Sequence, residues 1–422
     1  MKDRRGVVAG RGLAAAIILG LGLAAMPTAY AQMTASPAFR QAVEVAQSSL
    51  KSGNISGASA AISGLSPSSP LEKYMAASLA MELAVKRGDV VAQRRAVAAI
   101  LESGAAPEGQ LAYLNGVAGY LSYQTGAIDN AITYLGRARQ LGDTDAKTAL
   151  MLIEAYARQR KPREAAALLD QVITAQKQAG QNVPASWYDR ASSFAYARKD
   201  WSALAGYSAA KLATAPVQRA DWRSVLVTYM AGADPEKEAR LDLYRLQAAT
   251  DALASERDYQ GYAALAAEQG YAAEAKTIIE VGQSKGKLAK VDPVITPLMR
   301  SLGKKAVVNL NAIKSLPGKA SSVASAAKAA QNGDDLLANS QYAEAVPYYR
   351  AALAKGGGDK ERVTTRLGIA LARSGDLEGA RQALAQVTDG RWAQIAAYWR
   401  AWVDVRSREA QASAAASAPS GA

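Results

Sequence analysis

A small residue returns along the chain at a nearly constant interval. The unbroken steps are 34 to 39 residues long, and two longer steps of 74 and 70 are close to twice that length. The series is Ala58, Ala92, Ala131, Ala165, Ala239, Ala275, Ala345 and Ala380. A period of this length is typical of stacked structural repeats rather than of a single globular core. It therefore predicts an extended repeat protein, and it leaves the binding partner open.

Composition and turn signals indicate that each repeat is helical. The chain is rich in Ala, Leu, Gln, Glu, Lys and Arg and has only two Phe, which favours helix. Alternation of apolar and polar residues with period two, the signal of a strand, is hard to find over any useful length. Gly-Asx pairs and glycines beside aromatic residues divide each period into two helices. We therefore expect a nearly all-α protein.

On these residues the chain resembles the tetratricopeptide repeat (TPR) family, whose unit is a helix-turn-helix. In that family, small residues on both helices let two antiparallel backbones approach closely. One clear copy holds Leu367-Gly368, Leu371, Gly375-Asp376-Leu377, Ala380 and Leu384, and another holds Gly119, Gly126, Ala131, Leu135 and Ala138. One departure is Leu204, which stands where Ala is expected. The resemblance implies a TPR-like α-solenoid, a superhelix of antiparallel helix pairs.

Residues 1–31 have the three parts of an export signal. These parts are a basic start with Lys2, Arg4, Arg5 and Arg11, an apolar stretch from 12 to 26, and the cleavage site Ala29-Tyr30-Ala31. An uncleaved anchor is the alternative, but a bilayer needs about 20 apolar residues and this run has 15. We expect cleavage after Ala31 and a periplasmic protein. General secretion and the twin-arginine route both stay open.

The chain has neither cysteine nor histidine. This excludes disulfides, thiol nucleophiles, lipidated cysteine, catalytic triads built on histidine, and histidine metal ligands. Phosphate-binding loops and a nucleophile elbow are absent, and Asp143 and Asp145 fit an inter-repeat turn better than a calcium loop. Paired carboxylates of a glycan-processing enzyme would need a separate compact domain, for which the repeats leave no room. We therefore expect no cofactor, no metal and no enzymatic activity.

Positive charge gathers in one segment that interrupts the repeats. Without the signal the chain carries a net charge of +10, and residues 285–328 hold nine Lys and Arg against Asp292 alone. The candidate basic patch is Lys304, Lys305 and Lys314. Such a segment fits an anionic envelope glycan or lipid, or an acidic partner protein, while the alternative is a solvated linker. Nucleic acid is not expected as a partner in this compartment.

Members of the TPR family usually bind peptides or helices of other proteins in a concave groove lined by first helices. The register given by Gly119 and Ala131 places a set of residues there: Tyr113, Tyr120, Tyr123, Gln124, Lys147, Glu154, Arg158, Tyr196 and Arg223. Clustered tyrosines give rigid, amphipathic contact area. The alternative is that some of them pack between helices. The resemblance implies a scaffold for protein–protein interaction in assembly or maintenance of the cell envelope.

We expect five parts along the chain. They are a signal peptide at 1–31, an N-terminal TPR-like array at 32–284, a basic degenerate repeat or linker at 285–328, C-terminal repeats with a capping helix at 329–406, and a disordered Ala/Ser tail at 407–422. The capping helix is predicted from Trp392, Ile395, Trp399 and Trp402, which recur at helical spacing. No later run of about 20 apolar residues predicts a transmembrane segment.

Overall fold

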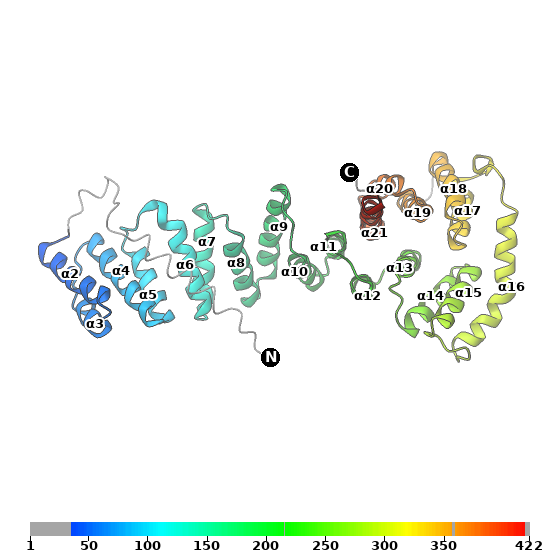
Figure 1. The fold of residues 1–422 in the computed structure, drawn as a ribbon. Helices are drawn as coiled ribbons and strands as arrows, with labels where there is room; N and C mark the ends of the chain where they lie inside the picture. Colours follow the sequence, from blue (N-terminus) through cyan, green and yellow to red (C-terminus); the bar gives the residue numbers. More distant parts are fainter. Residues whose placement is uncertain (1–34, 215, 357–358, 418–422) are drawn as a thin grey trace. The chain divides into compact units, whose positions relative to one another are not determined.

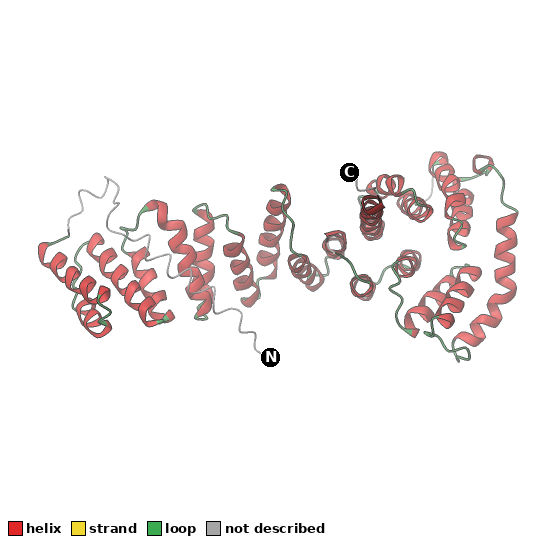
Figure 2. Ribbon diagram, viewed as in Figure 1, coloured by secondary structure: helices red, strands yellow, loops and turns green. Residues whose placement is uncertain are grey.

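The computed structural model describes residues 35–214, 216–356 and 359–417. Within these ranges the chain forms twenty α-helices, short 3-10 turns and no strand (Figure 2). It divides into two compact units, the first ending at Ala175 and the second beginning at Gln176. The predicted signal peptide lies outside the described residues. Among the helices described, none is long and apolar enough to cross a bilayer.

The first unit is a stack of helical hairpins (Figure 1). Its helices are α2 (Pro37–Lys51), α3 (Ile55–Ser63), α4 (Pro70–Arg87), α5 (Val90–Glu102), α6 (Leu111–Gln124), α7 (Ile128–Gln140), α8 (Ala146–Arg158) and most of α9 (Pro162–Gln178). Helix α6 packs against α7 within its hairpin and against α5 and α8 on either side. Because the contacts join helices that are close in sequence, the unit is a solenoid. The predicted all-α, TPR-like fold is confirmed.

The second unit continues with the same kind of hairpin. Its helices are α10 (Ala185–Ala197), α11 (Trp201–Thr214), α12 (Arg219–Ala233), α13 (Lys237–Ala249), α14 (Glu256–Glu268), α15 (Ala272–Ser284), α16 (Ile295–Lys314), α17 (Ala326–Ala338), α18 (Tyr342–Lys355), α19 (Lys360–Ser374), α20 (Leu377–Ala385) and α21 (Gly390–Ser417). Helices α14 and α15, α17 and α18, and α19 and α20 pack in pairs, whereas α16 lies between two pairs and packs mainly on α15.

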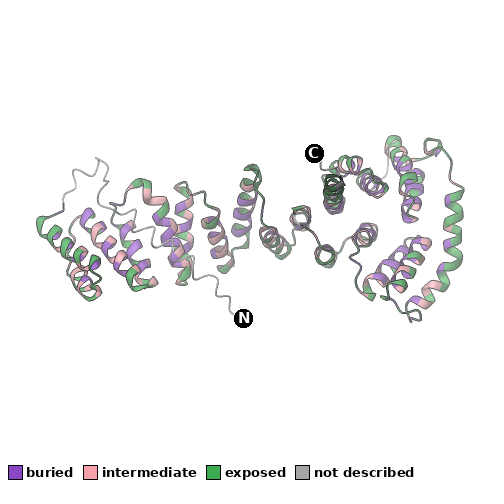
Figure 3. Cartoon of the chain, in the orientation of Figure 1, coloured by how far each residue is buried: buried purple, intermediate pink, exposed green. Residues whose placement is uncertain are grey.

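One position in the second helix of a hairpin explains the repeated small residue. The fourth residue of the helix is completely buried in six hairpins, at Ala58, Ala131, Ala165, Ala275, Ala345 and Ala380. The facing helix is equally restricted, since a Cβ on Gly119 would lie 2.5 Å from Leu135, and one on Gly368 would lie 2.5 Å from Leu384. Figure 3 shows the buried residues recurring along the helices. Small side chains are therefore what permits the close approach.

The predicted register is wrong by one residue in the second hairpin. The period points to Ala92, but the fourth residue of α5 is Gln93, and it is Gln93 that is buried. Its side-chain amide donates to the carbonyl oxygen of Ala84 in the last turn of α4, at 3.4 Å. This hydrogen bond satisfies the polar group, so a longer side chain is accepted there. Ala92 is only partly buried.

Glu72 ties the beginning of α2 to the beginning of α4. Its carboxylate accepts hydrogen bonds from the backbone N–H groups of Ser68 and Ser36, both at 2.8 Å, and from the Ser68 hydroxyl at 2.7 Å. Glu72 also lies in the first turn of α4, where the helix dipole favours a negative charge. These bonds, first from Ser68 and then from Ser36, lower the pKa of Glu72 to about 2.

Acidification is therefore expected to destabilise the first unit through Glu72. Because the folded pKa lies below the unfolded value, the stabilisation is complete above about pH 4.5 and is lost as the pH falls toward 2. Urea unfolding, followed by circular dichroism at pH 6, 4 and 3, measures this loss of stability. The Glu72→Gln variant should be less stable at pH 6 and less sensitive to acid. Glu44→Gln, at an exposed carboxylate on α2, is the control, and equal pH profiles for both variants would contradict the assignment.

The last helix closes the second unit. The four apolar residues predicted for a capping helix are buried in α21, as expected: Trp392, Ile395, Trp399 and Trp402. Helix α21 packs against α19 and α20, and it also returns to α11 and α13 (Figure 1). The Tyr398 ring meets the Tyr229 ring of α12 edge-on, with centroids 5.2 Å apart. The helix thus covers the last repeat and also joins it to earlier ones.

Helix α21 extends farther than the composition indicates. Residues 407–417 continue the helix to Ser417, where a disordered tail was expected from residue 407. The extension is rich in Ala, which has the highest helix propensity, and it follows an already formed helix, so it carries no nucleation cost. Residues 418–422 of the predicted tail lie outside the described residues.

The basic segment belongs to the second unit. Residues 285–328 form α16, the 3-10 turn η4 (Ala320–Ser322), the first turn of α17 and the connecting loops, and the unit containing them begins at Gln176. The boundaries expected at 284 and 328 stay predictions.

Candidate partner-binding surfaces

The structure brings several of the predicted groove residues together on α6 and α8. These two helices contact each other as the first helices of neighbouring hairpins. The guanidinium of Arg158 lies over the ring of Tyr123, 4.2 Å from its centroid. The side-chain amide of Gln124 donates to the hydroxyl of Tyr120. The sequence register therefore selected residues that share one surface of the first unit.

We call this surface the α6–α8 face. Its members are Tyr113, Tyr120, Tyr123, Gln124, Lys147, Glu154 and Arg158. Tyr113 is 41% exposed, and the part of it that is buried raises the pKa of its phenol. Tyr120 and Tyr123 are half-buried, and Tyr120 packs against the core formed by α4, α5 and α6. Rings that are anchored at one edge and accessible at the other lose little entropy on binding.

The α8 residues of this face follow helical spacing. Lys147, Glu154 and Arg158 are separated by seven and four residues, which places them along one side of the helix. Lys147 and Arg158 are exposed and Glu154 is half-buried. The face thus combines aromatic rings with two cations and one carboxylate.

The last two predicted groove residues lie in the second unit. Tyr196 is 43% exposed and meets the Trp201 ring edge-on at 5.5 Å. Arg223 instead pairs with Asp258 at 3.0 Å and reaches the Ser255 hydroxyl at 3.4 Å, at the start of α14. Its guanidinium is therefore engaged inside the unit. A role in partner binding stays a prediction for both residues.

The three lysines of the predicted basic patch are exposed on α16. Lys304, Lys305 and Lys314 form no ion pair within the described residues, and no Asp or Glu occurs between Pro293 and Gly333. Apolar side chains lie among them, since Val307 is 55% exposed, Val308 65% and Leu310 45%. Helix α16 therefore presents cations together with apolar groups.

Sequence reasoning missed a buried network of charges inside the second unit. Arg366 is completely buried and pairs with Asp242 at 3.0 Å and with Asp334 at 2.8 Å. Asp242 also pairs with Arg245 at 2.6 Å, and Arg245 holds both oxygens of Glu274 at 2.8 Å. The network joins α13, α15, α17 and α19.

The charges in this network balance. With Arg362, which pairs with Asp334 at 2.7 Å, it contains three arginines and three buried carboxylates, and the more exposed Glu238 lies 3.5 Å from Arg362 at its edge. Burial opposes the charge on Arg366, yet Asp242 and Asp334 raise its pKa further above the ordinary value. Burial likewise opposes ionisation of Asp334, but Arg366 and Arg362 keep its pKa below the usual range. Because removal of one partner would leave a buried charge uncompensated, we expect the network to hold these helices together.

The described part of the chain has no cluster of metal-binding side chains. Groups of three or more Asp and Glu that could hold a metal do not occur there, and the chain has no His or Cys. Three of the buried carboxylates, Asp242, Glu274 and Asp334, are paired with arginines. The other two, Glu72 and Asp292, accept hydrogen bonds from backbone N–H groups at the starts of helices.

No protein-family model matches the sequence, and no curated protein matches it. Several solved structures resemble it. A tetratricopeptide repeat protein from Parabacteroides merdae aligns at 9% identity over 76% of this chain and 94% of its own, with a TM-score of 0.25. The yeast Sti1 TPR2AB domain in its pHSP90 complex aligns at 14% identity over 69% of this chain and 99% of its own, with a TM-score of 0.25.

A further resemblance is to the pentatricopeptide repeat protein PPR10 from maize, at 15% identity over 86% of this chain and 55% of that one, with a TM-score of 0.29. The assignment to the helical-repeat class rests on the hairpins of this chain.

Proposed function

We propose that this chain is an exported, non-enzymatic scaffold that binds a partner protein of the cell envelope through the α6–α8 face. The observation that carries the proposal is the cluster of tyrosines on α6, one of which is covered by Arg158 of the next hairpin. Tyrosine and arginine are enriched where binding energy concentrates in protein interfaces. Export and a periplasmic location rest on residues 1–31 of the sequence.

Partner capture from the periplasm by a crosslinking pull-down tests the proposal. Replacing Tyr113, Tyr120 and Tyr123 by Ala should reduce recovery of the specific partner by tenfold or more, since truncating a hot-spot residue costs about 2 kcal/mol or more. The control is Tyr156→Ala, because Tyr156 lies two positions after Glu154 and therefore on the other side of α8. Circular dichroism establishes that both variants fold. Unchanged capture by a folded triple variant would refute the assignment.

A second candidate function is supported by the exposed valines and unpaired cations of α16. A glycan offers hydroxyl groups and charges but no apolar environment for an exposed valine. A lipid bilayer accommodates both the cations and the valines. We therefore favour an anionic lipid surface over a glycan as the ligand of this helix.

Flotation with vesicles containing phosphatidylglycerol tests the second candidate. Binding should fall steeply with salt and should be lost when Lys304, Lys305 and Lys314 become Gln. Equal binding to neutral phosphatidylcholine vesicles, or binding indifferent to the lysine changes, would eliminate this candidate.

A further inference from the structure

Arg373, in the last turn of α19, differs from the other arginines that are shielded within the second unit. Most of these pair with a carboxylate, and they include Arg223, Arg240, Arg245, Arg362, Arg366 and Arg381. Arg373 is also partly buried, but it forms no ion pair within the residues that the structure describes. A shielded cation without an acid of its own is suited to an anionic ligand.

Two aromatic rings lie beside the guanidinium of Arg373. It lies 4.9 Å from the centroid of the Tyr342 ring and 6.0 Å from that of Trp402. Contacts with rings engage the faces of a guanidinium and leave its N–H groups, which lie in its plane, able to donate. A planar array of N–H donors matches the two oxygens of a carboxylate.

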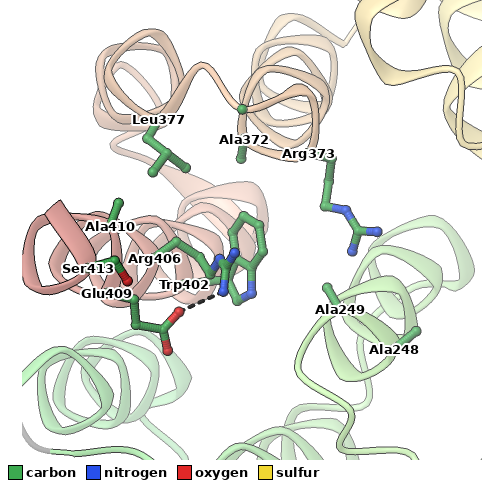
Figure 4. A pocket seen from close by; sticks show the side chains of 11 residues that line it. Ala248, Ala249, Ala372, Arg373, Leu377, Trp402, Arg406, Glu409, Ala410 and Ser413 are labelled. Carbon is green, nitrogen blue, oxygen red and sulfur yellow. Dashed lines mark hydrogen bonds and ion pairs between the residues drawn. The ribbon is translucent and has the colours of Figure 1, made fainter. Parts of the chain in front are cut away.

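The guanidinium faces a cavity of about 740 Å³ between α13, α19, α20 and α21 (Figure 4). Ala248 and Ala249 of α13 form the opposite wall, so that side of the cavity is small and apolar. The one acidic residue in the lining is Glu409, and it is already paired with Arg406 at 2.7 Å. Arg373 is therefore the cation of this lining that has no carboxylate partner among the described residues.

A second cavity of about 600 Å³ adjoins the first and shares Ala248 and Arg373 with it. Most of its lining is apolar, including Ile278, Val281, Leu310, Leu337 and Ile369. Four charged residues line it. Arg245 and Glu274 pair with each other, and the other two are Lys276 and Arg373. The pair of cavities thus offers a cationic anchor beside an apolar compartment.

We propose that Arg373 binds the carboxylate of an amphipathic ligand whose apolar part enters the adjoining cavity. The site lies in the second unit and is independent of the α6–α8 face. Its chemistry fits a free fatty acid, and it equally fits an acidic residue flanked by apolar side chains in another protein. Both sources share one requirement, a carboxylate attached to an apolar group.

Calorimetric titration of the full-length protein separates these possibilities. Decanoate should bind at least tenfold more tightly than decanol, which has the same chain without the charge. A blocked Leu-Leu-Glu-Leu peptide forms the second arm, and tighter binding of the peptide than of decanoate would identify a protein segment as the source. Equal affinity for decanoate and decanol, or binding of neither decanoate nor the peptide, would overturn the proposal.

Two variants and one control variant test where the ligand binds. Arg373→Gln should weaken decanoate binding by about tenfold to a hundredfold, because a charge-assisted bidentate contact is lost. Arg400→Gln, at an exposed position of α21, removes the same charge and should have no effect. Ala248→Leu narrows the junction of the two cavities and should weaken decanoate more than hexanoate. Wild-type affinity in a folded Arg373→Gln protein, or equal effects of Ala248→Leu on both acids, would place the ligand elsewhere.

Discussion

Replacing Arg366 by Met is expected to lower the free energy of unfolding of the second unit by about 3 to 5 kcal/mol. Arg366 is completely buried and pairs with Asp242 and Asp334. Without it, the buried network keeps three carboxylates and only two arginines, and one negative charge loses its compensation in a medium of low polarity. Urea unfolding of the full-length protein, followed by circular dichroism, measures the change.

Two controls make the Arg366 result specific. Arg219→Met breaks the ion pair with Asp251 in which Arg219 is 72% exposed, and such a pair contributes about 1 kcal/mol or less. The double variant Arg366→Met with Asp334→Asn restores the charge balance and should recover part of the lost stability. A loss below about 1 kcal/mol for Arg366→Met alone would show that the network does not hold the hairpins together.

Truncating Trp399 to Ala is expected to cost about 3 to 5 kcal/mol, the range for large aromatic residues in a core. Trp399 is completely buried in α21, its ring lies 5.7 Å from that of Trp402, and its indole N–H donates to the Asp242 carbonyl oxygen at 3.2 Å. The change removes packing and also the hydrogen bond that connects α21 to α13. Thermal unfolding and near-ultraviolet circular dichroism report the effect.

Trp399 also helps α21 to contact the earlier helices of the second unit. Loss of the contact should increase hydrogen exchange in α21 and in the helices to which it returns, α11 and α13. Trp187→Ala, at a partly exposed position in α10, should leave exchange in α21 unchanged. Increased exchange confined to α21 would mean that the helix caps the last repeat without bracing α11 and α13.

The hairpins could be predicted because their signal is local. Ala131 and Ala380 recur with Gly119 and Gly368 because each pair permits one close helix approach, and the same contact is made again in each hairpin. The period of small residues does not reveal every such position, because larger side chains occupy some of them. Gln93 occupies a small-residue position through a hydrogen bond, and Leu204 is buried at the fourth position of α11, so neither can be read from the period alone.

The closure of the second unit could not be predicted because its contacts are far apart in sequence. Trp399 meets Asp242 across 157 positions, and nothing in the apolar stripe of α21 distinguishes a cap from a brace. The charge network was missed for a related reason. Arg and Asp are residue types that usually lie on the solvated surface. Arg366 and Asp334 can be buried only because they pair with each other.

The candidate surfaces, too, could be predicted only in part. Tyr123 and Arg158 could be placed on neighbouring first helices because the register of two adjacent hairpins was sufficient. Arg223 fitted the same positional rule, yet it pairs with Asp258, because the register gives the side of a helix and not the partner of a side chain. No sequence motif surrounds Arg373, and the two rings beside it come from α18 and α21.

Site-specific photocrosslinking in living cells can detect directly whether the α6–α8 face binds a partner protein. A photoreactive amino acid at Tyr113 should give one dominant crosslinked species, and the same probe at Tyr156 should not give it. We expect this species to disappear when Tyr120, Tyr123 and Arg158 are replaced by Ala in a protein that stays folded. Identical crosslinks from both positions, or a species that survives those replacements, would contradict this expectation.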